Sequence, residues 1–247
     1  MPYLLGLKVL TDRIPVQPGY PFTLPFVAEL DLRILSPVVF LVGENGTGKS
    51  TLIEAIAALC RFPVSGGGRN ELAYQHGPER ESMLARVLRP SFRKHPTDGY
   101  FLRAEFQAHF ASLLDERKLD PDFDGDPYGR YGGRSLHTRS HGEAFLAVLE
   151  NRIGRGLFLM DEPESALSPQ RQLALLALIH DHMMSGTSQF VIATHSPILM
   201  TYPGAQIVCF DTGKLSPTLL EETSHYQVTR GILERPELYL KHLTGKS

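Results

Sequence analysis

A glycine-rich loop that carries a lysine and three hydroxyls is the part of the sequence with the most definite chemistry. It consists of Gly43, Glu44, Asn45, Gly46, Thr47, Gly48, Lys49, Ser50 and Thr51. Glycines let the backbone fold with its N–H groups directed at phosphate oxygens, where a Cβ would clash or forbid the dihedral angles. Lys49 can reach the β- and γ-phosphates, and the Ser50 hydroxyl can ligate Mg²⁺. The spacing predicts a site for a nucleoside triphosphate.

Two carboxylates, Asp161 and Glu162, end an apolar run in the second half of the chain, residues 156–160. Acids at the end of a buried strand are costly unless they meet a cation or take part in chemistry. In a nucleotide site we expect Asp161 to hold the Mg²⁺ shell and Glu162 to polarise the attacking water.

A histidine follows the next apolar run. Residues 189–193 are a predicted strand, and His195 comes just after it. If that strand lies beside the strand that carries the acids, His195 lies at the edge of the sheet where the γ-phosphate should be. We therefore expect a phosphate contact there, and we take Glu162, His195 and Lys49 as the candidate catalytic residues.

These residues require a particular set of elements. The loop needs a strand before it, at residues 38–42, and a helix after it, from Thr51 to about Cys60, whose N-terminus faces the anion. The prolines of the first 35 residues suit short strands of a small antiparallel layer. From about residue 134 to Phe210, strands alternate with helices. The sequence predicts an α/β fold with a mostly parallel central sheet flanked by helices.

The segments between these elements are less regular. A glycine break at 65–70 precedes a weakly helical basic segment through Leu88, and residues 99–106 are a predicted strand. A loop at 120–134 is rich in Gly, Pro and Asp, and one or two short helices, interrupted at Pro236, are expected over 227–243. We expect one domain, residues 1–247, in which about 63–139 forms a helical and loop insertion.

Composition limits the function classes. The chain has 247 residues and a formal net charge of −2, which argues against a globally basic nucleic-acid binder. The segment from Arg61 to Arg103, however, contains eight Lys and Arg residues and only four acidic residues. This excess of positive charge fits either a patch that binds a phosphate backbone or a solvated helical face. The sequence begins without a secretory pattern and has no apolar run of membrane-span length, so we expect a cytoplasmic protein. Its two cysteines, Cys60 and Cys209, lack metal-ligand spacing and are expected core residues.

Ser140 and Glu143 have the spacing of a capping box, and the apolar run 144–149 that follows is helical in period. Alone, this pattern predicts only the start of a helix. It stands about twenty residues before Asp161, however, and this order leads to a family resemblance.

The order of these motifs, from about Pro37 to Ile198, resembles the ABC-type ATPases. The resemblance implies the following correspondences: the family signature with Ser140, His141, Gly142 and Glu143, the catalytic glutamate with Glu162, the D-loop with 165–168, and the switch histidine with His195. It implies that ATP and Mg²⁺ are bound and that two copies pair head to tail. The signature helix of one copy would then close on the γ-phosphate held by the other.

The branch of the family is suggested by departures from the transporter pattern. The signature normally reads Leu-Ser-Gly-Gly-Gln, and residues 139–143 are closer to the branch that includes the SMC and RecF DNA-repair ATPases. Ser168 replaces the usual acid of the D-loop. We therefore expect an ATP-dependent homodimer with DNA as a candidate partner, in repair or defence. The alternative is the ATP-binding subunit of a membrane transporter; a binding module that uses ATP only as a switch is disfavoured by Glu162 and His195.

Three smaller assignments remain open. Glu105 and Gln107 rank equally as the Q-loop residue that senses the γ-phosphate and Mg²⁺, and Tyr20 and Phe22 are the candidates for stacking on adenine. Residues 120–125 imitate the first half of a calcium loop. The twelfth position is Tyr131 instead of a bidentate glutamate, so we interpret the segment as an acidic surface loop.

Overall fold

A central sheet of seven strands organises the part of the chain that the computed structural model describes, residues 3–68, 81–103, 107–121, 123, 125–131, 133–138 and 140–244. The strand order is β10-β9-β3-β8-β7-β6-β4. The five inner strands are parallel: β9 (Gln206–Cys209), β3 (Val38–Val42), β8 (Ser188–Ala193), β7 (Gly156–Asp161) and β6 (Gly99–Arg103). The edge strands β10 (Ser216–Thr218) and β4 (Gly67–Gly68) pair antiparallel. The predicted mostly parallel sheet is confirmed.

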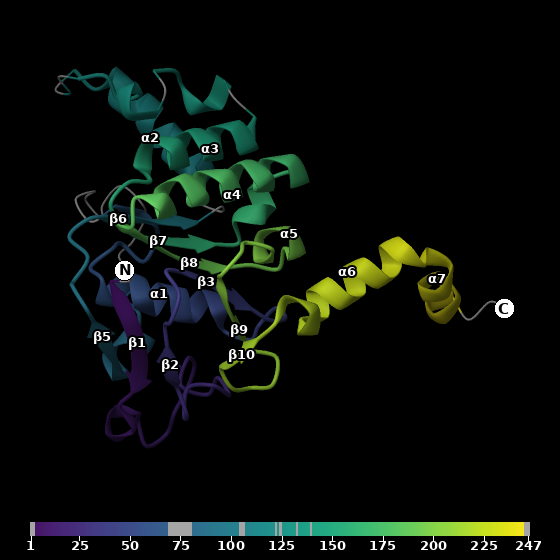
Figure 1. Ribbon diagram of the computed structural model, residues 1–247. Coiled ribbons are helices and arrows are strands. Elements are labelled where there is room, and N and C mark those ends of the chain that lie inside the picture. Colours follow the sequence, from purple (N-terminus) through teal and green to yellow (C-terminus); the bar gives the residue numbers. More distant parts are fainter. Residues whose placement is uncertain are drawn as a thin grey trace.

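Helices cover both faces of this sheet, which explains why its inner strands are largely apolar. Every residue of β3, β7 and β8 is buried, as expected for a parallel sheet between two helical layers. In Figure 1, α1 lies on one side of the sheet and α3 and α4 lie on the other. The helices next to the sheet are α1 (Lys49–Leu59), α3 (His141–Arg152), α4 (Pro169–Met184) and the short α5 (Pro197–Met200).

Each face has its own core. Leu52, Ile53 and Ile56 of α1 pack with one set of strand side chains and with the small N-terminal sheet. On the other face, Phe145 of α3 and Ile179 of α4 pack against strand side chains of opposite orientation. Because side chains alternate along a strand, one sheet serves both cores.

A second, antiparallel sheet has the order β2-β1-β5, with β2 at Asp31–Arg33, β1 at Leu4–Val9 and β5 at Leu88–Phe92. The predicted antiparallel layer is confirmed, but the prediction of a helical segment through Leu88 was wrong at its end. Only Leu84–Val87 form a 3₁₀ turn, and the chain then extends because β1 offers it a partner edge. Pairing with β1 outweighs the weak helical propensity of these residues.

The region before α3 also differs from expectation. The strand predicted over 99–106 ends at Arg103, and residues 104–106 lie outside the described residues. Helix α2 (Gln107–Leu119) was not predicted. Gly67 and Gly68, expected as part of a glycine break, pair with Tyr100 and Phe101. The remaining 3₁₀ turns are at Thr11–Arg13, Gly129–Tyr131, Leu136–Thr138, Pro163–Ala166 and Leu220–Glu222.

The C-terminal segment forms α6 (Ser224–Glu234) and α7 (Pro236–Thr244). The two short helices and their interruption at Pro236 are as predicted. Figure 1 shows both helices projecting from the rest of the molecule, and side chains beyond Tyr226 are mostly exposed. Among the described residues, no helix is both long and apolar enough to cross a membrane.

Two glutamines connect the two sheets. The Gln189 side chain of β8 is fully buried; its Oε1 accepts from Tyr3 N at 2.6 Å and Leu4 N at 2.8 Å, and its Nε2 donates to Leu4 O at 2.9 Å. Gln206 of β9 makes a similar clamp near solvent, accepting from Leu35 N and donating to Arg33 O, both at 2.8 Å. The two clamps differ mainly in burial.

Gln189→Ala should therefore cost far more stability than Gln206→Ala. The first change leaves buried backbone groups of Leu4 without partners, so we expect a loss of about 2–4 kcal/mol. The second frees groups that water can reach, so we expect a loss below about 1 kcal/mol. Urea unfolding of both variants measures the difference, and equal losses would contradict this account of the clamps.

Candidate functional site

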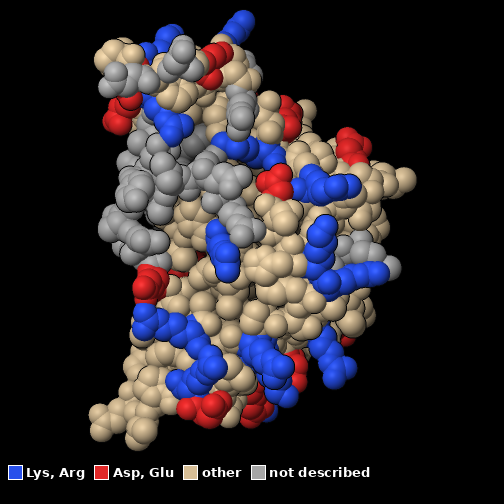
Figure 2. All heavy atoms as spheres, turned by 90° about the vertical axis from the view of Figure 1, so that its left-hand side faces the viewer, with Lys and Arg blue, Asp and Glu red and all other residues tan. Residues whose placement is uncertain are grey.

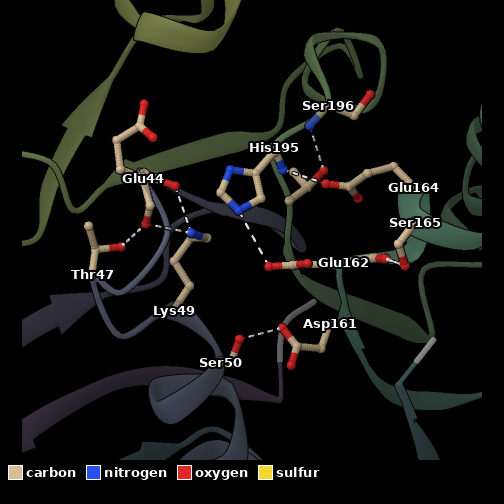
Figure 3. Close-up of polar contacts among 12 residues, drawn as sticks. Glu44, Thr47, Lys49, Ser50, Asp161, Glu162, Glu164, Ser165, His195 and Ser196 are labelled. Carbon is tan, nitrogen blue, oxygen red and sulfur yellow. Dashed lines mark hydrogen bonds and ion pairs between the residues drawn. The ribbon is translucent and has the colours of Figure 1, made fainter. Parts of the chain in front are cut away.

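Three inner strands bring the predicted site residues to one edge of the sheet. The glycine loop follows β3, Asp161 ends β7, and His195 follows β8. β8 pairs in parallel with both β3 and β7, so their carboxyl ends adjoin. Figure 3 shows the His195 side chain pointing into the space between Lys49 and Glu162. The sequence predicted this convergence correctly.

The loop encloses the lysine. Lys49 Nζ donates to Gly43 O at 2.6 Å and to Glu44 O at 3.0 Å, and the side chain is 4% exposed. Burial lowers the pKa of Lys49, while Glu162 and Asp161 act in the opposite direction. The ammonium group is thus held by two neutral carbonyls, which an anionic phosphate oxygen can replace as a stronger partner.

The first turn of α1 is open to an anion. Gly48, its N-cap, has φ +96°, and no side chain caps the helix. A Cβ at Gly48 would lie 2.7 Å from Phe26 Cε1, so both backbone angle and space require glycine. The first turn holds no acid, so its N–H groups and the positive end of the helix dipole remain for a ligand.

A bound cation would stabilise the buried carboxylate of Asp161. Ser50 Oγ donates to Asp161 Oδ1 at 3.0 Å, and Arg103 Nη2 lies 3.7 Å from Oδ2. Burial raises the pKa of Asp161 to about 6, although Arg103 and Ser50 act to lower it. The Ser50 hydroxyl and Asp161 carboxylate are hard oxygen donors of the kind Mg²⁺ takes. Among the described residues no group of three or more His, Cys, Asp or Glu could hold a metal.

Glu162 and His195 face each other across the edge. Glu162 has the left-handed backbone angle φ 48°, and its N–H donates to Ala193 O at 2.9 Å. Non-glycine residues in this region are often at functional positions. Glu162 Oε1 lies 3.4 Å from His195 Nε2. Burial and the nearby Lys49 lower the pKa of His195 against the opposing effect of Glu162, which favours the neutral ring.

A second acid holds the histidine backbone. Glu164 Oε1 accepts from His195 N at 2.5 Å, and Ser165 Oγ donates to Glu162 O at 2.8 Å. Burial raises the pKa of Glu164. The turn Pro163–Ala166 is thus tied both to the acid before it and to the end of β8. Glu164 was not among the predicted site residues.

Arg103 and Asp211 also belong to this edge and were missed. Arg103 ends β6 directly opposite Asp161, and its Nη1 donates to Glu54 Oε1 at 2.6 Å. Asp211 follows β9, and its Oδ1 accepts from Glu44 N at 2.7 Å. A charged residue at the end of an apolar strand is the signal that identified Asp161; it marks both residues as candidates, but only the strand order places them beside Asp161 and the glycine loop.

The two Q-loop candidates remain predictions. Glu105 lies outside the described residues, and Gln107 is the first residue of α2, with its side chain outside the described part. Of the adenine candidates, Tyr20 lies beside the loop: its hydroxyl is 2.5 Å from Thr51 Oγ1, and the residue is 72% exposed. Phe22 is only partly exposed and packs against the core.

The start of α3 is built as the capping box predicts. Ser140 Oγ accepts from Glu143 N at 3.4 Å, and Ser140 N donates to Glu143 Oε2 at 2.9 Å. A Cβ on Gly142 would lie 2.9 Å from Ala166 O, because this helix start packs on the turn after Glu162. His141 is the first residue of α3, and its side chain is not described. Ser140 is exposed, and its described side-chain hydrogen bonds go to Glu143, not to the glycine loop of the same chain.

The described Lys and Arg residues of the basic segment lie on separate elements. Arg103 lies at the edge of the central sheet where the parallel strands end, and Arg86 pairs with Glu81. Arg69 and Arg80 lie outside the described residues. The side chains of Arg89, Arg93 and Lys94 are exposed on and after β5. Figure 2 shows Lys and Arg side chains spread across the face of the molecule seen there, with uncharged residues between them. In the calcium-like segment, Asp122 and Asp124 also lie outside the described residues.

Strand, glycine loop, helix start and paired acids together define a P-loop nucleotide hydrolase. Similarity to known proteins supports this class. The family described as "AAA domain, putative AbiEii toxin, Type IV TA system" matches residues 143–201. The hemin import ATP-binding protein HmuV of Rhodopseudomonas palustris (strain ATCC BAA-98 / CGA009) is 32% identical over 193 residues, which are 69% of this chain and 69% of that protein. The chain belongs to the ABC-type ATPases; it binds ATP and is an ATP hydrolase.

A more distant relative and a solved structure also match most of the chain, and the solved structure bears on the fold alone. Translation initiation factor RLI1 of Saccharomyces cerevisiae is 23% identical over 209 residues, 84% of this chain but 31% of that protein, so the chain spans about a third of its length. Among solved structures, MJ1267, an ATP-binding cassette of an ABC transporter, matches with a TM-score of 0.53 and 15% sequence identity. The match covers 97% of this chain and 98% of the MJ1267 chain. The SMC- and RecF-like branch stays a prediction.

The raised pKa of Asp161 generates a stability prediction for the protein without nucleotide or Mg²⁺. Because the pKa of Asp161 is about 6 when folded and near its ordinary 3.8 when unfolded, the folded state binds more protons and stability falls as pH rises between these values. Asp161→Asn removes this penalty, so at pH 8 it should be more stable by about 3 kcal/mol. The gain should shrink below pH 6 and vanish near pH 4.

Thermal unfolding at pH 8 and pH 4.5 measures this change. Asp31→Asn, an exposed acid paired with Lys8 at 3.5 Å, is the control and should change little at either pH. A destabilised Asp161→Asn protein at pH 8 would contradict the electrostatic account.

Proposed function

We propose that this chain hydrolyses ATP with Mg²⁺ at the edge formed by β3, β7 and β8, and that the cycle closes and reopens a homodimer. The observation that carries the proposal is the 3.0 Å contact between Ser50 Oγ and Asp161 Oδ1. It joins the phosphate loop to the acid pair, so one triphosphate can meet both. Such juxtaposition is the main requirement of phosphoryl transfer, where catalysis consists largely of positioning and charge stabilisation.

In this proposal the loop binds the triphosphate first. Residues 43–51 surround it with backbone N–H groups, and Lys49 exchanges its loop carbonyls for β- and γ-phosphate oxygens. Ser50 and Asp161 would hold Mg²⁺, which supplies charge neutralisation of the phosphate oxygens. The exposed ring of Tyr20 offers a stacking surface for adenine beside Thr51.

Glu162 and His195 act on the terminal phosphate. Glu162 accepts a hydrogen bond from a water and orients it in line with the γ-phosphorus. The water oxygen then bonds to phosphorus as the bond to the β,γ-bridging oxygen breaks, giving ADP and phosphate. His195, neutral and 3.4 Å from Glu162, can donate from Nε2 to the carboxylate or to a γ-phosphate oxygen.

The second copy supplies the other half of the site. The exposed start of α3, with Ser140 through Glu143, offers first-turn N–H groups that bind anions, and it does not bond to its own loop. The similarity to a dimeric bacterial ABC transporter cassette, MJ0796, with a TM-score of 0.52 and 14% identity over 90% of this chain and all of that one, supports a paired arrangement. We propose that Ser140 of each copy closes on the ATP of the other.

We further propose that residues 1–247 form one ATPase domain that includes the segment 63–139. Strands β4 and β6 lie within this segment and belong to the central sheet, so it is part of the same core. Arg103, at the end of β6, also contacts Asp161.

Two processes are candidates for what the ATP hydrolysis cycle drives. The exposed Arg89, Arg93 and Lys94, and the matched family's description as a putative AbiEii toxin of a Type IV TA system, favour DNA or defence. The similarity to HmuV, a hemin import ATP-binding protein, favours a membrane partner. Labelled duplex and an ATP-locked protein decide between them: a salt-dependent shift supports the first, whereas no shift at low salt together with co-purification of an integral membrane subunit supports the second.

Glu162→Gln is the direct test of hydrolysis. Removing a positioned base should lower turnover by about 10²–10⁴-fold and leave ATP affinity within about twofold, because the phosphate loop is intact. Phosphate release and calorimetry measure the two quantities. Glu29→Gln, an exposed acid paired with Lys214 at 2.7 Å, is the control and should keep full activity. Undiminished hydrolysis by Glu162→Gln would refute the assigned base.

Ser140→Asp tests the trans contact. Aspartate caps helices as well as serine, so α3 should persist, but its negative charge would repel the partner's γ-phosphate. In the Glu162→Gln background, ATP should shift the parent protein to a dimer in sedimentation and leave the Ser140→Asp protein monomeric. Ser140→Thr serves as the uncharged control. Dimerisation of all three proteins with ATP would exclude Ser140 from the interface.

A further inference from the structure

A second histidine lies behind His195. His225 is in the first turn of α6, and its Nε2 lies 2.8 Å from His195 Nδ1, with the two ring centroids 4.9 Å apart. The other ring nitrogen of His195 faces Glu162 Oε1 at 3.4 Å. The three side chains therefore form a line from the C-terminal helix to the acid after β7.

Among the described residues His195 Nε2 has no hydrogen-bond partner at this distance, but it faces an acceptor, and this sets one consistent arrangement of ring protons along the line. The side of His195 that faces the carboxylate, Nε2, should carry the proton, because a carboxylate only accepts. With a neutral ring, Nδ1 then accepts, so the donor must be His225 Nε2–H. His225 Nδ1 is left as an acceptor, and Ser224 Oγ lies 3.4 Å from it. Only this tautomer of His195 presents an N–H to the γ-phosphate side.

We propose that His225 is a positioning residue that fixes the tautomer and ring orientation of His195 through this hydrogen bond. The inference rests on the roles proposed above for Glu162 and His195. His225 itself does not touch the reacting atoms. Its effect should therefore fall on the hydrolysis step and not on ATP binding.

The first turn of α6 is held firmly enough for this role. Thr223, which is 2% exposed, caps the helix by accepting from Tyr226 N at 3.3 Å and donates to Leu220 O at 2.7 Å. Ser224 Oγ also lies 3.4 Å from Asp211 Oδ2, the carboxylate whose other oxygen accepts from Glu44 N of the glycine loop. The later turns of α6 project from the molecule, so only its start is fixed at the site (Figure 1).

Three variants test the proposal. His225→Leu keeps the bulk and removes the donor, and His225→Gln keeps an N–H close to the position of Nε2. Val228→Ala, at a position 55% exposed on the same helix, is the control for changes in helix stability. Steady-state ATP hydrolysis and calorimetry with ATP separate kcat from binding.

We expect His225→Leu to lower kcat about tenfold, the effect of losing one hydrogen bond that acts in the hydrolysis step, with ATP affinity unchanged. His225→Gln should retain at least about half of the wild-type kcat, and Val228→Ala should match the wild type. An unchanged kcat in His225→Leu, an equal loss in His225→Gln, or a loss confined to ATP affinity would each overturn the proposal.

Nitrogen NMR of the imidazoles keeps the test decisive if His225→Leu folds poorly. The wild type should show His195 with its proton on Nε2, and His225→Gln should preserve this tautomer; a His195 proton on Nδ1 in the wild type would overturn the proposal. Glu162→Gln and His195→Ala separate the two levels of inference. If both lose turnover and His225→Leu does not, only the role of His225 fails; if both keep turnover, the proposed function fails with it.

Discussion

The buried charge of Asp161 is the constraint around which this edge of the sheet is arranged. The carboxylate ends a strand with no exposed residue, and its raised pKa reflects the cost of burying it. Arg103 compensates from the neighbouring strand, but Glu54 of α1 also binds that guanidinium and so shares its charge. The free protein therefore keeps a carboxylate that is only partly neutralised. A destabilised acid of this kind is a natural cation ligand, and affinity for Mg²⁺ and stability of the empty site then change in opposite directions.

The same edge also explains which residues were predictable. The glycine loop, the acid pair and the capping box are local patterns, and each predicts its own backbone: a phosphate-binding turn, a strand end and a helix start. Arg103, Asp211 and His225 reach the site only through the lateral order of β6, β9 and α6. One sequence without strand order does not contain that information. The strand β5 was missed for the same reason, because its extended form comes from pairing with β1 and not from its own residues.

Polar contacts tie the segments of the site into one unit. Glu164 connects the turn after Glu162 to the backbone of His195, and Gly142 lets the start of α3 pack on that same turn. A movement of Glu162 or His195 would thus also move the start of α3, which is proposed to contact the second copy. This contact offers a physical route between hydrolysis and the proposed dimer opening, because a Cβ on Gly142 would lie 2.9 Å from Ala166 O of the turn.

The C-terminal helices add a route that the sequence motifs do not contain. Glu44, Asp211, Ser224 and His225 form a chain of polar contacts that runs from the glycine loop to His195 on the side away from Glu162. His195 is therefore held from two directions, by Glu164 at its backbone and by His225 at its ring. Because α6 continues outward with exposed Val228 and Leu233, a movement of this helix would reach His195 through the ring contact and the glycine loop through Ser224 and Asp211. The ring contact is the shorter of the two at the start of α6, 2.8 Å against 3.4 Å, so control through α6 would act most directly on the orientation of His195.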